Sequence, residues 1–162
     1  MAKKTKKEFV LNKYYPYIVF AVALGCAGMM FLPGVDLVFN LIIKEEVTSV
    51  MGWQVIFGYT GTEANIELMT FSFMALLAVI LPVAGGLVPL LLRSKLGAMI
   101  SLGCFAVGAV FAFMMVLFVM PTTALTWLTG ANCTIALGIG SILLGALSIV
   151  GAGFGAIKIL VK

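Results

Sequence analysis

The sequence predicts an all-α membrane protein: a four-helix transmembrane bundle with N- and C-termini cytoplasmic and a small extracellular β-hairpin or interfacial segment in the first outer loop. Three observations predict this fold. The hydrophobic fraction is 63% and the charged fraction only 10%, whereas soluble domains contain about 25% charged residues. Four apolar runs are each long enough to cross about 30 Å of hydrocarbon. The basic residues gather on one side of these runs, as the positive-inside rule requires.

The apolar runs set the domain organisation. The predicted spans cover residues 14–32, 68–92, 96–120 and 134–161. They form a single four-span membrane domain over 14–162, and Lys158, near the last end, is their one charged residue. For the first span the alternative is a cleaved signal peptide, which is disfavoured because no small-x-small site lies at its far end, where Phe31-Leu32-Pro33 closes the span.

Positive charge orients the predicted bundle. If the four helices alternate in direction, nine of the ten Lys and Arg residues fall on one side, and five of the six acidic residues fall on the other. The basic nine are Lys3, Lys4, Lys6, Lys7, Lys13, Arg93, Lys95, Lys158 and Lys162. We therefore expect residues 1–13 to form a cytoplasmic polybasic arm that anchors the topology, with lipid recognition or partner docking as the alternative roles.

The two predicted outer loops, 33–67 and 121–133, differ in size, and the first carries two strand-like runs. Residues 35–43 and 53–59 both alternate apolar side chains at period two, which predicts a β-hairpin. A short interfacial helix is the alternative for the first run. In the second run Trp53, Phe57 and Tyr59 share one predicted face. This face is expected either to cover the outer ends of the helices or to bind a partner protein.

The fourth span carries a long stripe of small residues. From Thr134 onward they recur at alternating steps of four and three, a mean period of about 3.5 that follows one helix face. The helix-packing candidates on this face are Gly138, Ser141, Gly145, Ser148, Ala152 and Gly155. Because helices in lipid associate through close backbone approach, the stripe predicts tight packing, either inside the chain or against a second copy or another subunit.

Several function classes are disfavoured by the sequence. No Asp, Glu, Lys, Arg or His lies in the middle of a predicted span, which argues against a proton-coupled transporter. The chain has no His and no Cys-x-x-Cys, so we expect no metal site, no cofactor and no catalytic residues. Glu63 and Glu67 are interpreted as a solvated cap at the outer start of the second span. No nucleic-acid partner is expected.

The layout of four spans, internal termini and a larger first outer loop with Gly52-Trp53 resembles the tetraspan arrangement of claudin-type proteins. That family carries a Gly-Leu-Trp run and a cysteine pair in this loop. Here there is no cysteine between Pro33 and Ala64. The resemblance therefore concerns architecture, and no functional residue is carried over from it.

Together these features predict a non-enzymatic small integral membrane protein of a plasma membrane, with a bacterial one favoured. It would act as an accessory, scaffold or adhesion-type subunit through its outer loop and its small-residue helix faces. Its expected partners are the lipid bilayer and either another protein or further copies of itself. The alternative is a pore or transporter component formed by oligomerisation.

Overall fold

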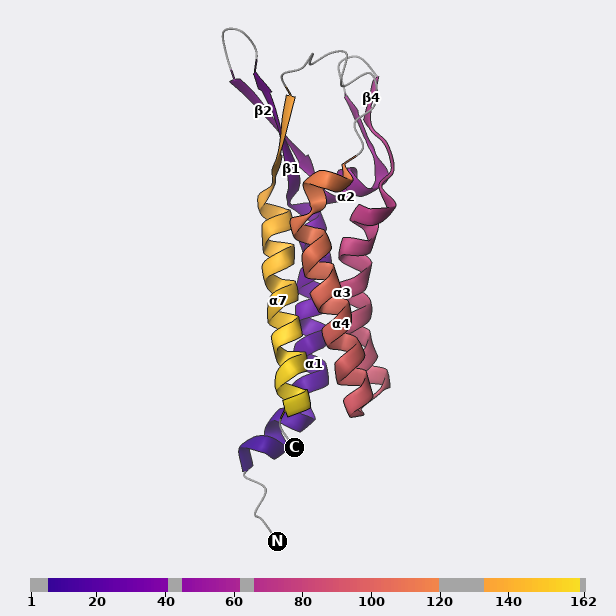
Figure 1. The fold of residues 1–162 in the computed structure, drawn as a ribbon, viewed down its shortest axis with the longest axis vertical. Coiled ribbons are helices and arrows are strands. Elements are labelled where there is room, and N and C mark those ends of the chain that lie inside the picture. Colours follow the sequence, from indigo (N-terminus) through magenta and orange to yellow (C-terminus); the bar gives the residue numbers. More distant parts are fainter. Residues whose placement is uncertain (1–5, 41–44, 62–65, 120–132, 161–162) are drawn as a thin grey trace.

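Four long apolar helices stand side by side, with β-strands gathered at one end of the bundle (Figure 1). This computed structural model describes residues 6–40, 45–61, 66–119 and 133–160. The four helices are long and apolar enough to cross a membrane, over Lys13–Phe31, Phe73–Leu91, Lys95–Phe113 and Ile139–Leu160. The chain is thus a multi-pass membrane protein, as the sequence predicts.

The bundle is a ring in which each helix contacts two neighbours. Its members are α1 (Lys6–Gly28), α3 (Phe73–Leu91), α4 (Lys95–Phe113) and α7 (Ile139–Leu160). α1 packs against α3 and α7, and α4 packs against the same two helices from the opposite side. α1 begins and α7 ends at one end of the bundle, and the strands lie at the opposite end (Figure 1).

Serine residues fix where α3 and α4 begin. Ser72 Oγ accepts a hydrogen bond from the Ala75 amide at 3.3 Å, and Ser94 Oγ accepts one from the Gly97 amide at 3.4 Å. Such caps occupy backbone donors that have no partner within the helix. As a result α3 begins at Phe73, five residues after the predicted start of the second span at Leu68.

The predicted third and fourth spans also differ from the observed helices at the strand-bearing end. α4 ends at Phe113 and is followed by the short helix α5 (Met115–Phe118). The first residues of the predicted fourth span belong to strand β5 (Cys133–Leu137), and α7 begins only at Ile139. The apolar stretch therefore continues out of the bundle as β-structure.

A three-stranded antiparallel sheet extends from the end of the bundle, and its strand order is β2-β1-β5. β1 (Pro33–Asn40) follows the 3₁₀ turn η1 (Met29–Phe31) and pairs with β2 (Glu45–Met51) on one edge and β5 on the other. Val35 and Leu37 alternate along β1 and are both fully buried. The period-two pattern of the first predicted run therefore does mark a strand.

The second predicted strand, 53–59, is wrong. Residues 53–57 lie in the short helix α2 (Gly52–Phe57), and the partner of β1 is β2, which the sequence places in the connection between strands. Val55 and Ile56 are adjacent in sequence and both buried, which a strand facing one core does not allow but a helix does. The alternation of apolar residues does not reveal β2, because it is an edge strand that begins with two glutamates, a composition typical of sheet edges.

A separate two-stranded hairpin follows α2. Gly58 ends the helix with a φ of 102°, a conformation that favours glycine, and β3 (Tyr59–Gly61) then pairs with β4 (Ile66–Met69). Glu67 therefore lies in strand β4 and not at the start of a helix. The prediction that it caps the second span together with Glu63 is wrong for this residue. Glu63, Lys44, the start of the basic arm and the second outer loop at 121–132 lie outside the described residues.

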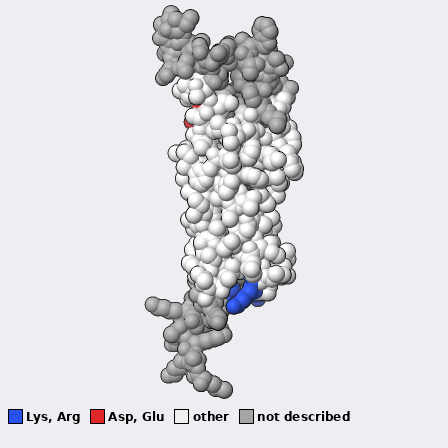
Figure 2. Space-filling view, viewed as in Figure 1, with Lys and Arg blue, Asp and Glu red and all other residues white. Residues whose placement is uncertain are grey.

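Charged side chains gather at the two ends of the molecule. Figure 2 shows Lys and Arg near the end where α1 begins, a small acidic area near the strands, and an uncharged surface between them on this face. Among the residues with described side chains, the basic ones are Lys13, Arg93, Lys95 and Lys158. We refer to these two ends as the basic end and the strand end.

One buried hydrogen bond joins α7 to the sheet, and its removal is expected to destabilise the protein measurably. Ser141 Oγ donates to the Gly34 carbonyl oxygen at 2.6 Å. That oxygen also accepts from the Gly138 amide at 3.0 Å. Ser141→Ala therefore leaves the acceptor partnered, and we expect a loss of about 1 kcal/mol in the free energy of unfolding, measured by reversible unfolding in mixed micelles.

Ser148→Ala is the matched control on the same helix. Ser148 is equally buried, but among the described residues the hydrogen-bonding partner of its hydroxyl is the sulfur of Cys26, at 3.8 Å. Because sulfur is a weak hydrogen-bonding partner, this variant should unfold close to wild type. Equal losses for the two variants would contradict the role assigned to the Ser141 bond.

Candidate interaction surfaces

Three exposed aromatic side chains at the strand end form what we term the α2 aromatic surface. Trp53 and Phe57 project from α2 with exposed fractions of 40% and 61%, and Phe71, just before α3, is 49% exposed. The rings of Phe57 and Phe71 lie 6.5 Å apart between centroids and are tilted by 39°. Large aromatic side chains with this exposure are typical of interface anchors.

Hydrogen bonds hold α2 rigidly at both ends. At its start, the Gly52 amide donates to the Leu32 carbonyl oxygen at 2.9 Å, and the Gln54 side chain accepts from the Met51 amide at 3.0 Å. At its end, the Ile56 carbonyl oxygen accepts from the Ser72 amide at 3.0 Å. The helix thereby bridges the sheet and the start of α3.

The inner face of α2 packs into the core at the strand end. Val55 and Ile56 are both buried, with exposed fractions of 1% and 0%. Trp53 instead donates from Nε1 to the sulfur of Met51, at 3.4 Å, within the same local segment. A rigid helix with a buried inner face and an exposed aromatic outer face is well prepared to bind a partner, since little ordering is needed on binding.

The structure brings together only part of the set predicted from sequence. Trp53 and Phe57 share the exposed face of α2, but Tyr59 lies in β3, is half-buried and packs against the core cluster. Phe71 was not predicted, because the second span was expected to start before it. An aromatic residue at the border of an apolar run is typical of the membrane interface, so the position of Phe71 in the sequence could have indicated its exposure.

The small-residue face of α7 points into the bundle and towards the sheet. Gly138, Ser141, Gly145, Ser148 and Gly155 are buried, and Ala152 is half-buried. Each glycine is close to a neighbour: a Cβ added at Gly145 would lie 2.6 Å from the ring of Phe113, and one at Gly155 would lie 3.0 Å from Leu102 Cβ. At Gly138 an added Cβ would strike the Pro33 carbonyl oxygen. These contacts are all within one copy of the chain.

Metal-ligand clusters do not occur among the described side chains: no group of three or more His, Cys, Asp or Glu residues is close enough to hold an ion. Comparison with known proteins adds no candidate, since no protein-family model, curated protein or solved structure matches this chain. The surfaces described here are therefore interpreted from their own chemistry.

Substitution of the glycines tests the packing of α7. We expect Gly138→Ala to cost about 1–3 kcal/mol of unfolding free energy, because overpacking against backbone cannot be relieved by a side-chain rotation. Gly145→Ala should cost less, since Phe113 is partly exposed and its ring can move. Unfolding in mixed micelles gives both values.

Gly153→Ala is the internal control for this series. It lies on the same helix, and an added Cβ there would meet no atom within 4 Å. Alanine is the better helix former, so this variant should be as stable as wild type or slightly more so. A similar loss at Gly153 and Gly138 would show that the close contacts do not govern stability.

Proposed function

We propose that this protein is a non-enzymatic accessory, scaffold or adhesion-type subunit of a plasma membrane, and that it binds a partner protein through the α2 aromatic surface. The observation that carries the proposal is the pairing of exposed aromatic rings with a firmly held short helix. Binding energy at protein interfaces is concentrated in a few aromatic anchors of this kind. Apolar patches that stay exposed on a folded protein commonly mark interaction sites.

The orientation belongs to the same proposal. The basic end lies in the cytoplasm and the strand end faces outward, because short basic segments are retained on the cytoplasmic side. In this orientation the α2 aromatic surface stands near the outer membrane surface. There it can meet either the outer domain of another membrane protein or a second copy of this chain.

A channel through one copy of the chain is disfavoured by the packing at the strand end. The cavity found between η1, α2, α3 and α7 is about 10 Å³, space for roughly one water molecule. A pore formed between several copies stays the alternative function. Solute flux through liposomes containing the purified protein alone would support that alternative and contradict the scaffold proposal.

Site-specific photocross-linking tests the proposed partner surface. A photoreactive phenylalanine analogue placed at position 53 should cross-link to one defined protein in native membranes. The same analogue at Ile100, which is exposed in the first half of α4, should cross-link to lipid. Lipid adducts alone at position 53 would identify the aromatics as membrane anchors and overturn the proposal.

The adduct also identifies the partner class, and a second variant checks that the contact matters. An adduct with twice the mass of the chain indicates a homo-oligomer, and any other mass indicates a different protein. Phe57→Ala should weaken co-purification of the cross-linked partner by about tenfold or more. Because Phe57 is largely exposed, the thermal stability of the variant protein should stay close to wild type. Unchanged co-purification would argue against the surface.

Cysteine labelling tests the proposed orientation. In a chain carrying Cys133→Ser, a membrane-impermeant maleimide should label Thr60→Cys in intact cells. Lys95→Cys should be labelled only after permeabilisation. Both positions are exposed and lie at opposite ends of the bundle, so the reverse pattern would invert the topology.

A further inference from the structure

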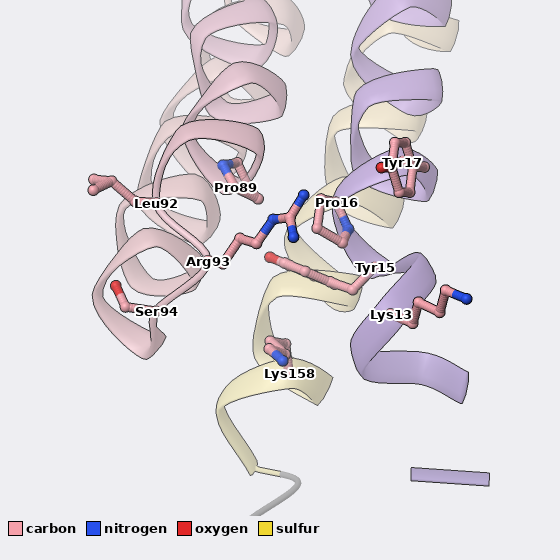
Figure 3. A pocket seen from close by; sticks show the side chains of 9 residues that line it. All are labelled: Lys13, Tyr15, Pro16, Tyr17, Pro89, Leu92, Arg93, Ser94 and Lys158. Carbon is pink, nitrogen blue, oxygen red and sulfur yellow. The ribbon is translucent and has the colours of Figure 1, made fainter. Parts of the chain in front are cut away.

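A cavity of about 170 Å³ opens at the basic end of the bundle, where α1, α3 and α7 meet. Its polar lining comes mainly from Lys13 and Tyr15 of α1, Arg93 of the α3–α4 connection and Lys158 of α7. Pro16 and Pro89 supply apolar walls (Figure 3). The volume is below the range of about 300–1,000 Å³ that is usual for drug-sized ligands, so a small group would fill it.

The lining of this cavity is positively charged. Arg93 and Lys158 border it, whereas the Lys13 side chain points away from it (Figure 3) and its Nζ lies 5.8 Å from the centre of the Tyr14 ring. No acidic side chain is among the described residues that line it. The wider basic end has the same character, because the sequence places nine basic residues and one acidic residue, Glu8, on that side. An anion is therefore the class of ligand that the electrostatics favour.

Tyr15 gives a second, independent indication of a ligand. Its side chain is only 4% exposed, yet its hydroxyl has no hydrogen-bond partner among the described residues. Burying a hydroxyl without a partner is unfavourable, and buried polar groups normally have one. In Figure 3 the Tyr15 and Arg93 side chains extend from opposite sides into the same region, and Lys158 Nζ lies 5.8 Å from the centre of the Tyr15 ring.

Ser101 of α4 is the other group that bears on the Tyr15 hydroxyl. The two hydroxyls lie near one another, but neither makes a hydrogen bond to the other or to any other group among the described residues. The Tyr15 hydroxyl therefore has a donor to offer a group in the cavity. Replacing Ser101 tests whether the Tyr15 hydroxyl donates to a group in the cavity or interacts only with Ser101 inside the bundle.

We propose that this cavity binds a phosphate group, carried either by an anionic lipid headgroup of the adjacent leaflet or by a soluble phosphate. Arginine matches phosphate with paired N–H donors, and the Tyr15 hydroxyl and the Lys158 ammonium group are further donors beside it. The cavity lies where the helices end, beside the exposed Tyr14 and Tyr17, and aromatic residues at this level are typical of the membrane interface. This site is independent of the proposed partner surface at the strand end.

Lipid retention tests the proposal on the full-length protein. In phosphatidylcholine nanodiscs containing some phosphatidylglycerol, native mass spectrometry of the released protein should show preferential retention of phosphatidylglycerol. Arg93→Gln should weaken retention by about fivefold, as expected for one interfacial charge. Tyr15→Phe should weaken it by about tenfold, as expected for a hydrogen bond to a charged group, and it removes only one oxygen atom from a buried side chain.

Two controls make the result specific. Ser101→Ala should retain phosphatidylglycerol as wild type does. If retention falls as much as in Tyr15→Phe, the Tyr15 hydroxyl acts by interacting with Ser101 inside the bundle, and the proposal fails. Lys44→Gln removes one charge that the proposed topology places on the opposite side, and it should have no effect. Equal losses for Lys44→Gln and Arg93→Gln would indicate general charge attraction and would also overturn the site.

A parallel arm distinguishes the two sources of phosphate. In nanodiscs of phosphatidylcholine alone, inorganic phosphate should raise the melting temperature of wild type but not of Arg93→Gln if the cavity takes a soluble ligand. Retained phosphatidylglycerol without this shift assigns the site to a lipid headgroup. Absence of both effects in the wild-type protein would refute phosphate binding.

Discussion

Close backbone contact along α7 is the constraint on which the rest of the structure depends. Apolar side chains gain little by leaving lipid for a helix interface, so association in the membrane needs close packing. The small residues of α7 allow this approach: Gly145 meets the ring of Phe113, and Gly155 meets Leu102. Larger side chains at these positions would separate α7 from α4.

The same helix joins the membrane bundle to the sheet. β5 runs into α7, and the Gly138 amide donates to the Gly34 carbonyl oxygen of β1 at 3.0 Å. Ser141 donates to the same oxygen from the first turn of the helix. Because the sheet is tied to α7, and α2 packs on β1 and η1, the position of the aromatic residues is set by the bundle beneath them.

The two ends of the molecule present different chemistry, and uncharged spans separate them. The strand end offers exposed rings on a short helix with a buried inner face, an arrangement suited to a protein surface. The basic end offers arginine, lysine and a buried phenol around a small cavity, an arrangement suited to an anion. No Asp, Glu, Lys, Arg or His lies midway along a span, and we treat the two ends as separate sites.

The sequence by itself determined the four spans, the gathering of basic residues at one end of them, and the strand at Val35 and Leu37. A membrane span requires a long apolar run, and a strand with one buried face requires alternating apolar residues, so both leave a pattern in the sequence. Tertiary structure decided the rest. Residues 53–57 alternate as a strand would, but the buried pair Val55 and Ile56 and the cap from Gln54 make them a helix. β5 pairs with β1 from about a hundred residues away, and Tyr15, Arg93 and Lys158 line one cavity only because three helices converge there. Such contacts depend on the spatial order of the helices, which local periodicity does not encode.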